Sequence, residues 1–524
     1  MTKEQNATVT SSINFYHPLA FWLGTFAVIF GVIAHIPMFL DAAEMNYHMA
    51  GMEMSAFMMT GMYAIVAGLF IVTYGLLPRN MLELRKHMHE DTDINIQAMD
   101  NAPLTANHWK LFMVLVVALI VDVMKPATLG FVVPGTAAEY GITKAHVALL
   151  PLAGISGTTI GSFLWGWLGD TIGRRSSILL AAIIFIGTAI CGAMPSYSWN
   201  VFMCFLMGFG AGGMLPITFA LLAEIIPAKQ RGWMIVTLGA VGTIGGYLAA
   251  SGCAAILEPI FGWRILWFLG LPTGAILLIL NRYIPESPRY LLAQGKKQEA
   301  YHILENFGVK ITAREDQPTE QKLTPEVKAG NLAEIFQHPY SPLTLSIGLY
   351  GVAWGLVNFG FLLWLPLNLR EMGLGTGVSD VILAKSAIIA FPATLICAWL
   401  YHSWSTKKTL VVFAMLTVIT LTGFAIVNVE LVNHPLLMKC LLVALLASSS
   451  CVIALLSPYT TEVFPVHIRT TASGWSAGCS KGAGVATLGI AALGLTPSLA
   501  AAAMVAAVPT FLAAVDISGQ KSYH

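Results

Sequence analysis

The chain has 524 residues, of which 56% are hydrophobic and only 10% are charged, and its formal net charge is +1. Soluble domains carry about 25% charged residues, so this composition excludes an ordinary soluble protein and indicates one built for lipid. No basic cluster interleaved with aromatic residues is present, which excludes a nucleic-acid-binding protein.

Apolar segments of about 20 residues recur along the chain, and each is long enough to cross roughly 30 Å of hydrocarbon as a helix. The first two span residues 19–40 and 55–77. The loop between them contains acidic residues but no Lys or Arg, whereas the next loop contains Arg79, Arg85 and Lys86. Because cytoplasmic loops are enriched in Lys and Arg, we predict that the amino terminus and this second loop are cytoplasmic.

Twelve further apolar segments form the body of the chain. They span residues 110–134, 145–168, 176–195, 200–226, 231–256, 263–284, 343–368, 381–402, 409–427, 436–462, 469–493 and 496–515. One long polar stretch separates the sixth from the seventh, and its Lys and Arg residues place it in the cytoplasm. We therefore predict 14 spans, with both termini cytoplasmic. The predicted parts are two extra helices with a linker (1–108), a six-helix half (109–284), a cytoplasmic linker with a surface helix (285–342) and a second six-helix half (343–524).

Two short motifs mark the ends of body segments on the cytoplasmic side. The first is Gly166-x-Leu168-x-Asp170-x2-Gly173-Arg174-Arg175, between the second and third body segments. The second is Glu224-x2-Pro227-x3-Arg231, which recurs in the other half as Glu462-x2-Pro465-x3-Arg469. A repeated motif of this kind indicates two related halves with a binding site between them near the middle of the membrane.

These motifs, together with Gly208-x-Gly210-x-Gly212-Gly213 and Pro285-Glu286-Ser287-Pro288-Arg289, resemble those of the major facilitator superfamily of transporters. The resemblance covers about residues 109–515 and is strongest to the sugar porters and to the organic-ion, niacin-type and aromatic-acid transporters. It implies an all-α membrane protein with two six-helix halves, to which two extra N-terminal transmembrane helices are added. It also implies that charged residues at the cytoplasmic ends form a gating network instead of binding substrate. These residues are Asp170, Arg174, Arg175, Glu224, Arg231, Glu286, Arg289, Glu462 and Arg469.

Ionisable residues inside the membrane are costly and therefore indicate function. Asp122 and Lys125 lie near the middle of the first body segment, three residues apart and so on one helix face. In the functional interpretation Asp122 takes up a proton and Lys125 is freed for an anionic substrate; in the alternative the two form a neutral packing pair. Lys481 lies deep in the eleventh body segment, where a cation resembles the pattern of anion carriers. Lys385 is a second candidate for the cavity, unless it extends to the membrane surface.

The seventh body segment offers a row of aromatic and polar side chains. Trp354, Asn358, Phe361 and Trp364 are spaced by four, three and three residues, which places them near one helix face. The aromatic rings would stack on a planar substrate and Asn358 would form hydrogen bonds with it, with Tyr247 adding to the same surface. Helix packing and anchoring at the interface is the alternative. The core has very few Gln residues, which argues against a sugar as substrate.

The N-terminal helices are rich in methionine. Met45, Met49, Met52, Met54, Met58, Met59 and Met62 accompany His48, and His87-Met88-His89 follows in the next loop. Thioethers and imidazoles suit Cu(I), but methionine is also a common filler of apolar space. We predict the second role and no metal site.

The sequence therefore predicts a secondary transporter of a bacterial-type inner membrane, working as a monomer. It would carry a small organic anion, a carboxylate with aromatic acids among the candidates, with protons by alternating access, without a cofactor and without enzymatic activity. One alternative is a proton-driven exporter of amphiphilic drugs or metabolites. Another is a metal-handling or sensing membrane protein that uses the methionine-rich helices. The sequence leaves open the substrate, the direction of transport and the role of the two extra helices.

Overall fold

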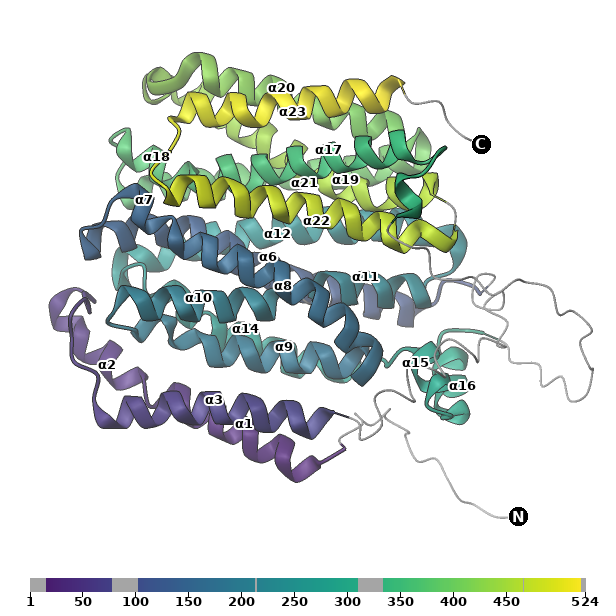
Figure 1. Cartoon of the computed structure of the whole chain (residues 1–524), viewed down its shortest axis with the longest axis horizontal. Coiled ribbons are helices and arrows are strands. Elements are labelled where there is room, and N and C mark those ends of the chain that lie inside the picture. The colour runs from purple at the N-terminus through teal and green to yellow at the C-terminus, as the bar shows by residue number, and fades with distance from the viewer. Residues whose placement is uncertain (1–15, 78–101, 213, 310–332, 465, 520–524) are drawn as a thin grey trace, which may run out of the picture.

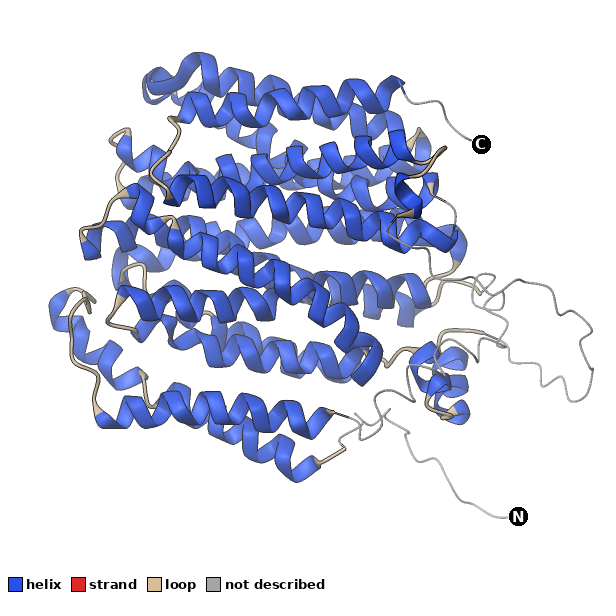
Figure 2. Ribbon diagram, in the orientation of Figure 1, coloured by secondary structure: helices blue, strands red, loops and turns tan. Residues whose placement is uncertain are grey.

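The computed structural model describes residues 16–77, 102–212, 214–309, 333–464 and 466–519. Every regular element in these ranges is a helix, as Figure 2 shows. Lipid offers no hydrogen-bond partners to the backbone, so a chain of this composition satisfies its amides within helices. The predicted all-helical class is confirmed.

The chain begins with a pair of closely packed helices, which we call the N-terminal hairpin. It contains α1 (Pro18–Ile33), α2 (Ile36–Asp41), η1 (Ala42–Met45) and α3 (Ala56–Leu76). Glycines bring the two long helices into backbone contact. A Cβ on Gly24 would lie 2.7 Å from the carbonyl oxygen of Gly68, and a Cβ on Gly31 would lie 2.4 Å from that of Gly61. Small residues at such crossings allow membrane helices to pack without a hydrophobic driving force.

Several methionines of the hairpin lie in an apolar cluster. Met49 and Met58 are buried together with Phe39 and Phe268, whose ring centroids are 4.8 Å apart, and so fill space between the hairpin and the body of the protein. Met45 is exposed. In the described ranges, no group of three or more His, Cys, Asp or Glu side chains could hold a metal ion. His87 and His89 lie outside these ranges.

The N-terminal half follows. Its elements are α6 (Ala106–Tyr140), α7 (Lys144–Val147), α8 (Leu149–Ile172), α9 (Arg174–Thr188), η2 (Ala189–Ala193), α10 (Tyr197–Ala211), α11 (Met214–Ile225), α12 (Ala228–Phe261), α13 (Ile265–Phe268), α14 (Gly270–Leu280) and η3 (Asn281–Tyr283). A glycine stripe sets α12 against α6. A Cβ on Gly246 would lie 2.9 Å from the backbone nitrogen of Met124, and one on Gly242 would lie 2.5 Å from the side chain of Leu119.

A linker packs beneath this half. It contains α15 (Pro288–Ala293), α16 (Lys297–Asn306) and η4 (Glu334–Phe336). The amphipathic surface helix predicted near residues 295–301 corresponds to α16, which buries Ala300, Ile303 and Leu304. Phe307, just after α16, packs on the ring of His108 at the start of α6, with centroids 4.9 Å apart. We call this end of the molecule the α15 face.

The C-terminal half completes the described chain. Its elements are α17 (Ser341–Gly355), the π-helical turn η5 (Leu356–Phe361), η6 (Leu362–Trp364), α18 (Leu365–Glu371), α19 (Thr376–Ser403), α20 (Thr406–Val427), η7 (Asn428–Asn433), α21 (Pro435–Val463), α22 (Val466–Ala492) and α23 (Leu499–Gly519). α17 lies directly on α22, because a Cβ on Gly355 would be 2.2 Å from the carbonyl oxygen of Ser480.

The two halves lie side by side, with α12 packed along α19 and α8 packed along α22 (Figure 1). The end opposite the α15 face carries α7 and α18, and we call it the α7 face. The N-terminal hairpin lies at the outer edge of the N-terminal half, where α1 and α3 contact α9. The hairpin is therefore attached to one half.

Twelve helices in the described ranges are long and apolar enough to cross a membrane. They include the segment Pro18–Met45 and the helix Ala56–Leu76 of the hairpin. α10 and α11, which are 15 and 12 residues long, and α22 are not among the twelve. A protein that crosses the membrane many times is confirmed, and the total of 14 crossings stays a prediction.

Candidate functional site

Lys481 on α22 lies between the two halves. Its amine donates a hydrogen bond to the hydroxyl of Ser162 on α8, and so joins the C-terminal half to the N-terminal half. The same hydroxyl donates to the carbonyl oxygen of Thr158 at 2.8 Å, or to that of Gly212 at 3.0 Å. The glycine contact of α17 with α22 at Ser480 fixes the helix next to this lysine. Lys481 is the sixteenth residue of a 27-residue helix and so lies near the middle of α22.

Asp122 on α6 lies within electrostatic range of Lys481 across the interface, although these two described side chains form no ion pair or hydrogen bond with each other in this conformation. Asp122 is buried, with 5% of the residue exposed. One carboxylate oxygen, Oδ1, has no hydrogen-bond partner in the described part of the chain. The structure thus brings together an acid of one half and a lysine of the other, near the middle of both helices.

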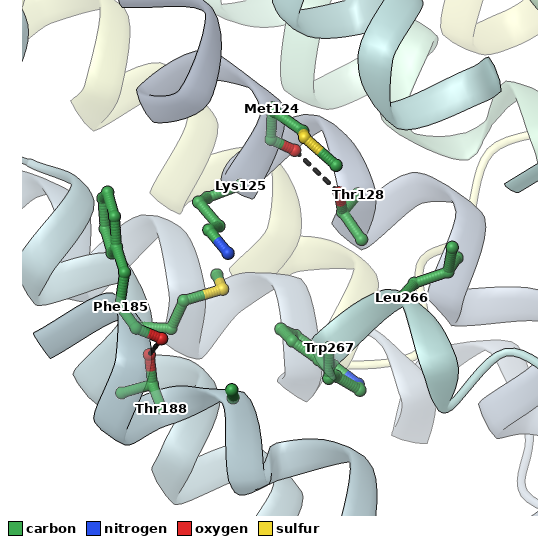
Figure 3. Close-up of a pocket in the computed structure, with 9 residues that line it drawn as sticks. Met124, Lys125, Thr128, Phe185, Thr188, Leu266 and Trp267 are labelled. Carbon is green, nitrogen blue, oxygen red and sulfur yellow. Dashed lines mark hydrogen bonds between the residues drawn. The ribbon is translucent and has the colours of Figure 1, made fainter. Parts of the chain in front are cut away.

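Lys125 lies one helical turn from Asp122 but has different neighbours. Figure 3 shows its amine directed toward the space between Phe185 and Trp267. The amine lies 5.4 Å from the centroid of the Phe185 ring, within the range of a cation–π contact. No ion pair between Lys125 and Asp122 is found among the described residues. The two residues therefore do not form the neutral pair that their spacing allowed.

The space beside Lys125 is small. It is a cavity of about 10 Å³ within the N-terminal half, lined by Met124, Lys125, Thr128, Phe185, Thr188, Ala189, Met207, Leu266 and Trp267. A cavity needs about this volume to hold one water molecule. In this conformation it has no room for an organic substrate, whereas Asp122 and Lys481 face the interface between the two halves.

The aromatic side chains of the seventh body segment point to different neighbours. The indole nitrogen of Trp354 donates to the carbonyl oxygen of Ser449 at 3.1 Å. Phe361 is fully buried against Phe424 of α20, with centroids 5.1 Å apart. The ring of Trp364 is buried, 5.8 Å from the amine of Lys144. Asn358, in the π-helical turn, is half-buried. A π-helical turn changes the angular spacing of side chains, so the face expected from a period of 3.6 residues is lost beyond Leu356.

Two further candidates lie apart from Lys481. The Tyr247 ring packs near Phe131, with centroids 5.8 Å apart, and its hydroxyl is buried without a hydrogen-bond partner among the described residues. Tyr247 also interacts electrostatically with Asp380 on α19. Lys385 is exposed on α19. The position of Lys385 agrees with the alternative in which this lysine extends to the membrane surface.

At the α15 face, Glu286 holds the start of α9. Its Oε1 accepts hydrogen bonds from the backbone nitrogens of Arg174 at 2.6 Å, Ser287 at 3.0 Å and Arg175 at 3.3 Å. A helix N-terminus leaves such N–H groups without partners and favours a negative charge. Gly173 has a φ of +95°, and a Cβ there would lie 2.4 Å from Oε2 of Glu286. Only glycine fits this turn.

Other charged residues of the predicted gating network form contacts within the N-terminal half or within the C-terminal half. Arg174 forms an ion pair with Glu224 at 3.4 Å, and Ser287 donates a hydrogen bond to the same carboxylate. The Arg231 guanidinium donates to the carbonyl oxygen of Ile226, at 3.1 Å from Nη2. In the C-terminal half, Glu462 accepts hydrogen bonds from the hydroxyls of Tyr401 at 2.8 Å and Thr406 at 3.0 Å.

Three other members of the predicted network remain. Arg289 is exposed. Asp170 lies in α8 and Arg469 in α22, but their side chains are outside the described part of the structure. The ion pair between Arg174 and Glu224 joins two residues of the N-terminal half.

Burial raises the pKa of Glu286 from 4.5 to about 7, and the N–H groups of Ser287, Arg175 and Arg174, with the charge of Arg174, offset only part of this effect. A carboxyl whose pKa is higher in the folded state stabilises the fold fully below pH 4.5. This stabilisation is lost as the pH rises toward 7. We expect the thermal stability of the purified protein to fall over this range, by about 3 kcal/mol if Glu286 acts alone.

In Glu286→Gln the part of the pH dependence between pH 5 and 7 should disappear, as measured by thermal unfolding in detergent. Glu305→Gln, at an exposed position of α16, is the control and should keep the wild-type profile. An unchanged profile in Glu286→Gln would show that another group carries the dependence.

At the α7 face the halves are joined by charged side chains that the sequence motifs did not indicate. Arg370 on α18 contacts two carboxylates. Its Nη2 lies 3.0 Å from Oε2 of Glu258 on α12 and 3.0 Å from Oδ2 of Asp380 on α19, and its Nη1 donates to Oε1 of Glu258 at 3.0 Å. Lys144 on α7 pairs with Glu371 at 3.2 Å and donates to Asn368 at 2.8 Å. Because Glu258 and Lys144 belong to the N-terminal half, these contacts close the α7 face.

A second buried ion pair lies at the α7 face within the N-terminal half. Arg264 and Glu139 have side chains that are 0% and 3% exposed, and Arg264 Nη2 lies 2.7 Å from Oε1 of Glu139. The same oxygen accepts hydrogen bonds from the backbone nitrogens of Met49 at 2.8 Å and Ala50 at 2.9 Å. This pair therefore binds the loop of the N-terminal hairpin to the body.

A comparison with protein families matches residues 111–488 to the family described as the Major Facilitator Superfamily. The chain is similar to the niacin transporter NiaP of Acinetobacter baylyi, with 26% identity over 75% of this chain and 88% of that protein. It is also similar to the 4-hydroxybenzoate transporter PcaK of the same organism (24% identity, 81% of this chain and 94% of that protein). The gallate transporter of Pseudomonas putida is 26% identical over 80% of this chain and 93% of that protein.

Among solved structures, the chain is similar to the inward-open xylose transporter XylE from E. coli, with a TM-score of 0.59 and 15% identity over 79% of this chain and 96% of that one. A D-xylose-proton symporter gives a TM-score of 0.60 at 16% identity, over 78% of this chain and 97% of that one. At this identity the likeness concerns the fold alone. The N-terminal hairpin precedes the residues that the family matches.

Proposed function

Because the chain belongs to the Major Facilitator Superfamily, and is thus a multi-pass membrane transporter and not an enzyme, we propose that it carries a small aromatic carboxylate together with protons. The observation that carries this proposal is the electrostatic interaction between Asp122 and Lys481 across the interface of the two halves. The names of three relatives, which refer to niacin, 4-hydroxybenzoate and gallate, support an aromatic acid as the cargo.

The chemistry of the pair explains how a proton and an anion would be coupled. With Asp122 ionised, its charge neutralises Lys481 and leaves nothing to attract an anion. A proton on Asp122 removes that partner, so that the ammonium of Lys481 binds the carboxylate of the substrate. An unpaired charge in the membrane interior is strongly disfavoured, so the site favours being filled by both ligands or by neither.

The arrangement in the membrane follows from the same proposal. We place the α15 face, whose linker contains several Lys and Arg residues, in the cytoplasm and the α7 face outside, in the inner membrane of a bacterial-type cell. The two halves then rock about the interface that holds Asp122 and Lys481. The hairpin adds two crossings to the twelve of the body, for 14 in total with both termini cytoplasmic, and the monomer is the working unit.

The test is proton movement evoked by candidate substrates in proteoliposomes with a pH-sensitive dye inside. Nicotinate, 4-hydroxybenzoate and benzoate should each acidify the lumen, whereas xylose and a quaternary ammonium ion should not. In Asp122→Asn the proton signal should fall at least about tenfold, because the group that accepts the proton is gone. Glu305→Gln, which changes an exposed acid on α16, is the control and should keep the wild-type signal.

Acidification by cations or neutral amphiphiles, with none by carboxylates, would contradict the proposal and favour the drug exporter. No signal from any organic compound would direct attention to the alternative of a metal-handling or sensing protein.

A further inference from the structure

Arg370, Glu258 and Asp380 form a buried group of three charges, which we call the Arg370 cluster. We propose that this cluster is a second proton-binding site, which takes up one proton from the outer solution as the halves close over the substrate. The inference rests on the proposed function for the coupling ion and for the outer position of the α7 face.

The charges of the cluster do not balance without a proton. One guanidinium lies 3.0 Å from each of two carboxylates, so the three ionised groups carry a net charge of −1. Asp380 is 0% exposed and Glu258 is 7% exposed. Two unit charges 4 Å apart interact by about 4 kcal/mol at the effective dielectric constant of a protein near its surface. The single cation can offset only one of the two carboxylates.

The two carboxyl groups also face one another. They are close enough for a hydrogen bond between Glu258 and Asp380. Such a bond requires a hydrogen on one of the two oxygens, since two carboxylates can only accept. One proton therefore makes the cluster neutral and satisfies the contact between the acids. It enters from the outer solution, binds to one carboxylate oxygen and breaks no covalent bond.

No neighbouring group in the described part of the chain supplies the missing positive charge. The Lys144 amine on α7 is already bound to Asn368 and Glu371. Ser379 and Tyr247, which contact or face Asp380, are uncharged hydroxyls. Lys385, further along α19, is exposed. The Tyr247 hydroxyl is buried without a hydrogen-bond partner among the described residues, so it adds no positive charge to the cluster.

The acids come from different halves, and this links proton binding to movement. Glu258 belongs to α12 of the N-terminal half and Asp380 to α19 of the C-terminal half. When the outer face opens, the acids separate, and water and Arg370 can stabilise each of them in its ionised form. A proton is therefore held more tightly in the closed state. By linkage, a proton in turn stabilises the closed state.

The Arg370 cluster differs from the Asp122 site in its position and in its proposed role. Asp122 lies at the middle of α6 and pairs with Lys481, whereas the Arg370 cluster lies at the ends of α12, α18 and α19. The outer cluster would sense the proton concentration that drives the cycle, and the central site would exchange a proton for the cargo. Both would favour closure of the outer face when protons are abundant outside.

The test measures the outer face directly, without substrate. Spin labels at His146→Cys on α7 and Gly375→Cys before α19 report the distance between the halves; both positions are exposed, and a Cβ on Gly375 meets nothing within 4 Å. Exposed Cys440 is replaced by serine in this background. The wild-type open population should grow from pH 6 to pH 9, by up to about tenfold per pH unit for one proton released.

Glu258→Gln and Asp380→Asn each remove one negative charge and keep the shape of the side chain. Either variant should stay closed over the whole pH range. Glu371→Gln breaks another contact between the halves at the same face and should keep the pH dependence, whatever its effect on the open fraction.

A wild-type distance that does not change with pH would overturn the inference, and so would a wild-type pH dependence that persists in both Glu258→Gln and Asp380→Asn. Failure of the proposed function gives a different result: carboxylates would evoke no proton movement, while the labels would still report opening at high pH.

Discussion

Replacement of Lys481 by alanine is expected to reduce uptake of nicotinate or 4-hydroxybenzoate by about 100-fold. The ammonium of Lys481, which is half-buried, lies at the interface between the halves, and a lost hydrogen bond to a charged group costs about 1.5–3 kcal/mol. The proton signal should disappear together with uptake, because Asp122 loses the partner that favours its ionised form. Uptake of radiolabelled acid and lumenal pH measure the two effects in the same vesicles.

Two lysine variants make this result specific. Lys481→Arg keeps the charge and should retain part of the uptake, whereas Lys385→Ala removes an exposed lysine of the same half and should retain nearly all of it. Normal uptake in Lys481→Ala would contradict the proposed anion site. Loss of uptake in Lys125→Ala alone would instead assign the anion to the small cavity beside Phe185 and Trp267, which would then have to expand.

Replacement of Arg264 by methionine is expected to destabilise the protein by about 3–5 kcal/mol, the cost of breaking a buried ion pair by removing one partner. Glu139 would stay buried without its cation, and the carbonyl oxygens of Gly192 and Met194, which accept from Nη1, would lose their donor. Since Glu139 also binds Met49 and Ala50, the hairpin loop should be loosened as well. Thermal unfolding in detergent measures the first effect, and proteolysis of the loop measures the second.

The matched control is Arg282→Met, which removes an exposed arginine of η3. The Nη2 of Arg282 donates a hydrogen bond to the hydroxyl of the neighbouring Tyr283. It should change stability by less than about 0.5 kcal/mol. Arg264→Met combined with Glu139→Gln should recover part of the loss, because no buried charge is left unpaired. A single Arg264→Met variant as stable as the control would show that the pair does not hold this face.

The sequence alone predicts those parts of the fold that depend on the length of the apolar segments. Each predicted body segment corresponds to one long helix or to a run of shorter ones, as with segment 200–226 and helices α10 and α11. The motifs also named Glu286, Arg174 and Glu224 as one group. In the structure the Glu286 carboxylate binds the backbone nitrogen of Arg174, and the side chain of Arg174 forms an ion pair with Glu224. Motif residues lie near the ends of consecutive helices, so their proximity follows from the order of the chain.

Contacts between distant segments were not predictable in this way. Arg370 and Glu258 belong to no repeated motif, and their pairing depends on how the two halves close. The π-helical turn at Leu356–Phe361 directs Phe361 to Phe424, although a regular helix would have kept Phe361 near Trp354 and Asn358. Lys125 and Asp122 have the spacing of a pair, but α9 and α22 supply each with a different neighbour. A single helical period contains no information on these neighbours.

The N-terminal hairpin changes the surroundings of α9. This helix and η2 form the segment Arg174–Ala193, and 94% of the residues in its most apolar stretch are buried. They are buried because α1 and α3 cover a side that would otherwise face lipid. Lipid chains adapt to side chains of any size, whereas a packed helix does not. Gly187 illustrates the difference, since a Cβ there would already lie 3.3 Å from Ile65 and 3.4 Å from Val28. Side-chain volume on this outer surface of α9 is therefore restricted, and α9 should tolerate substitutions as a helix of a protein interior does.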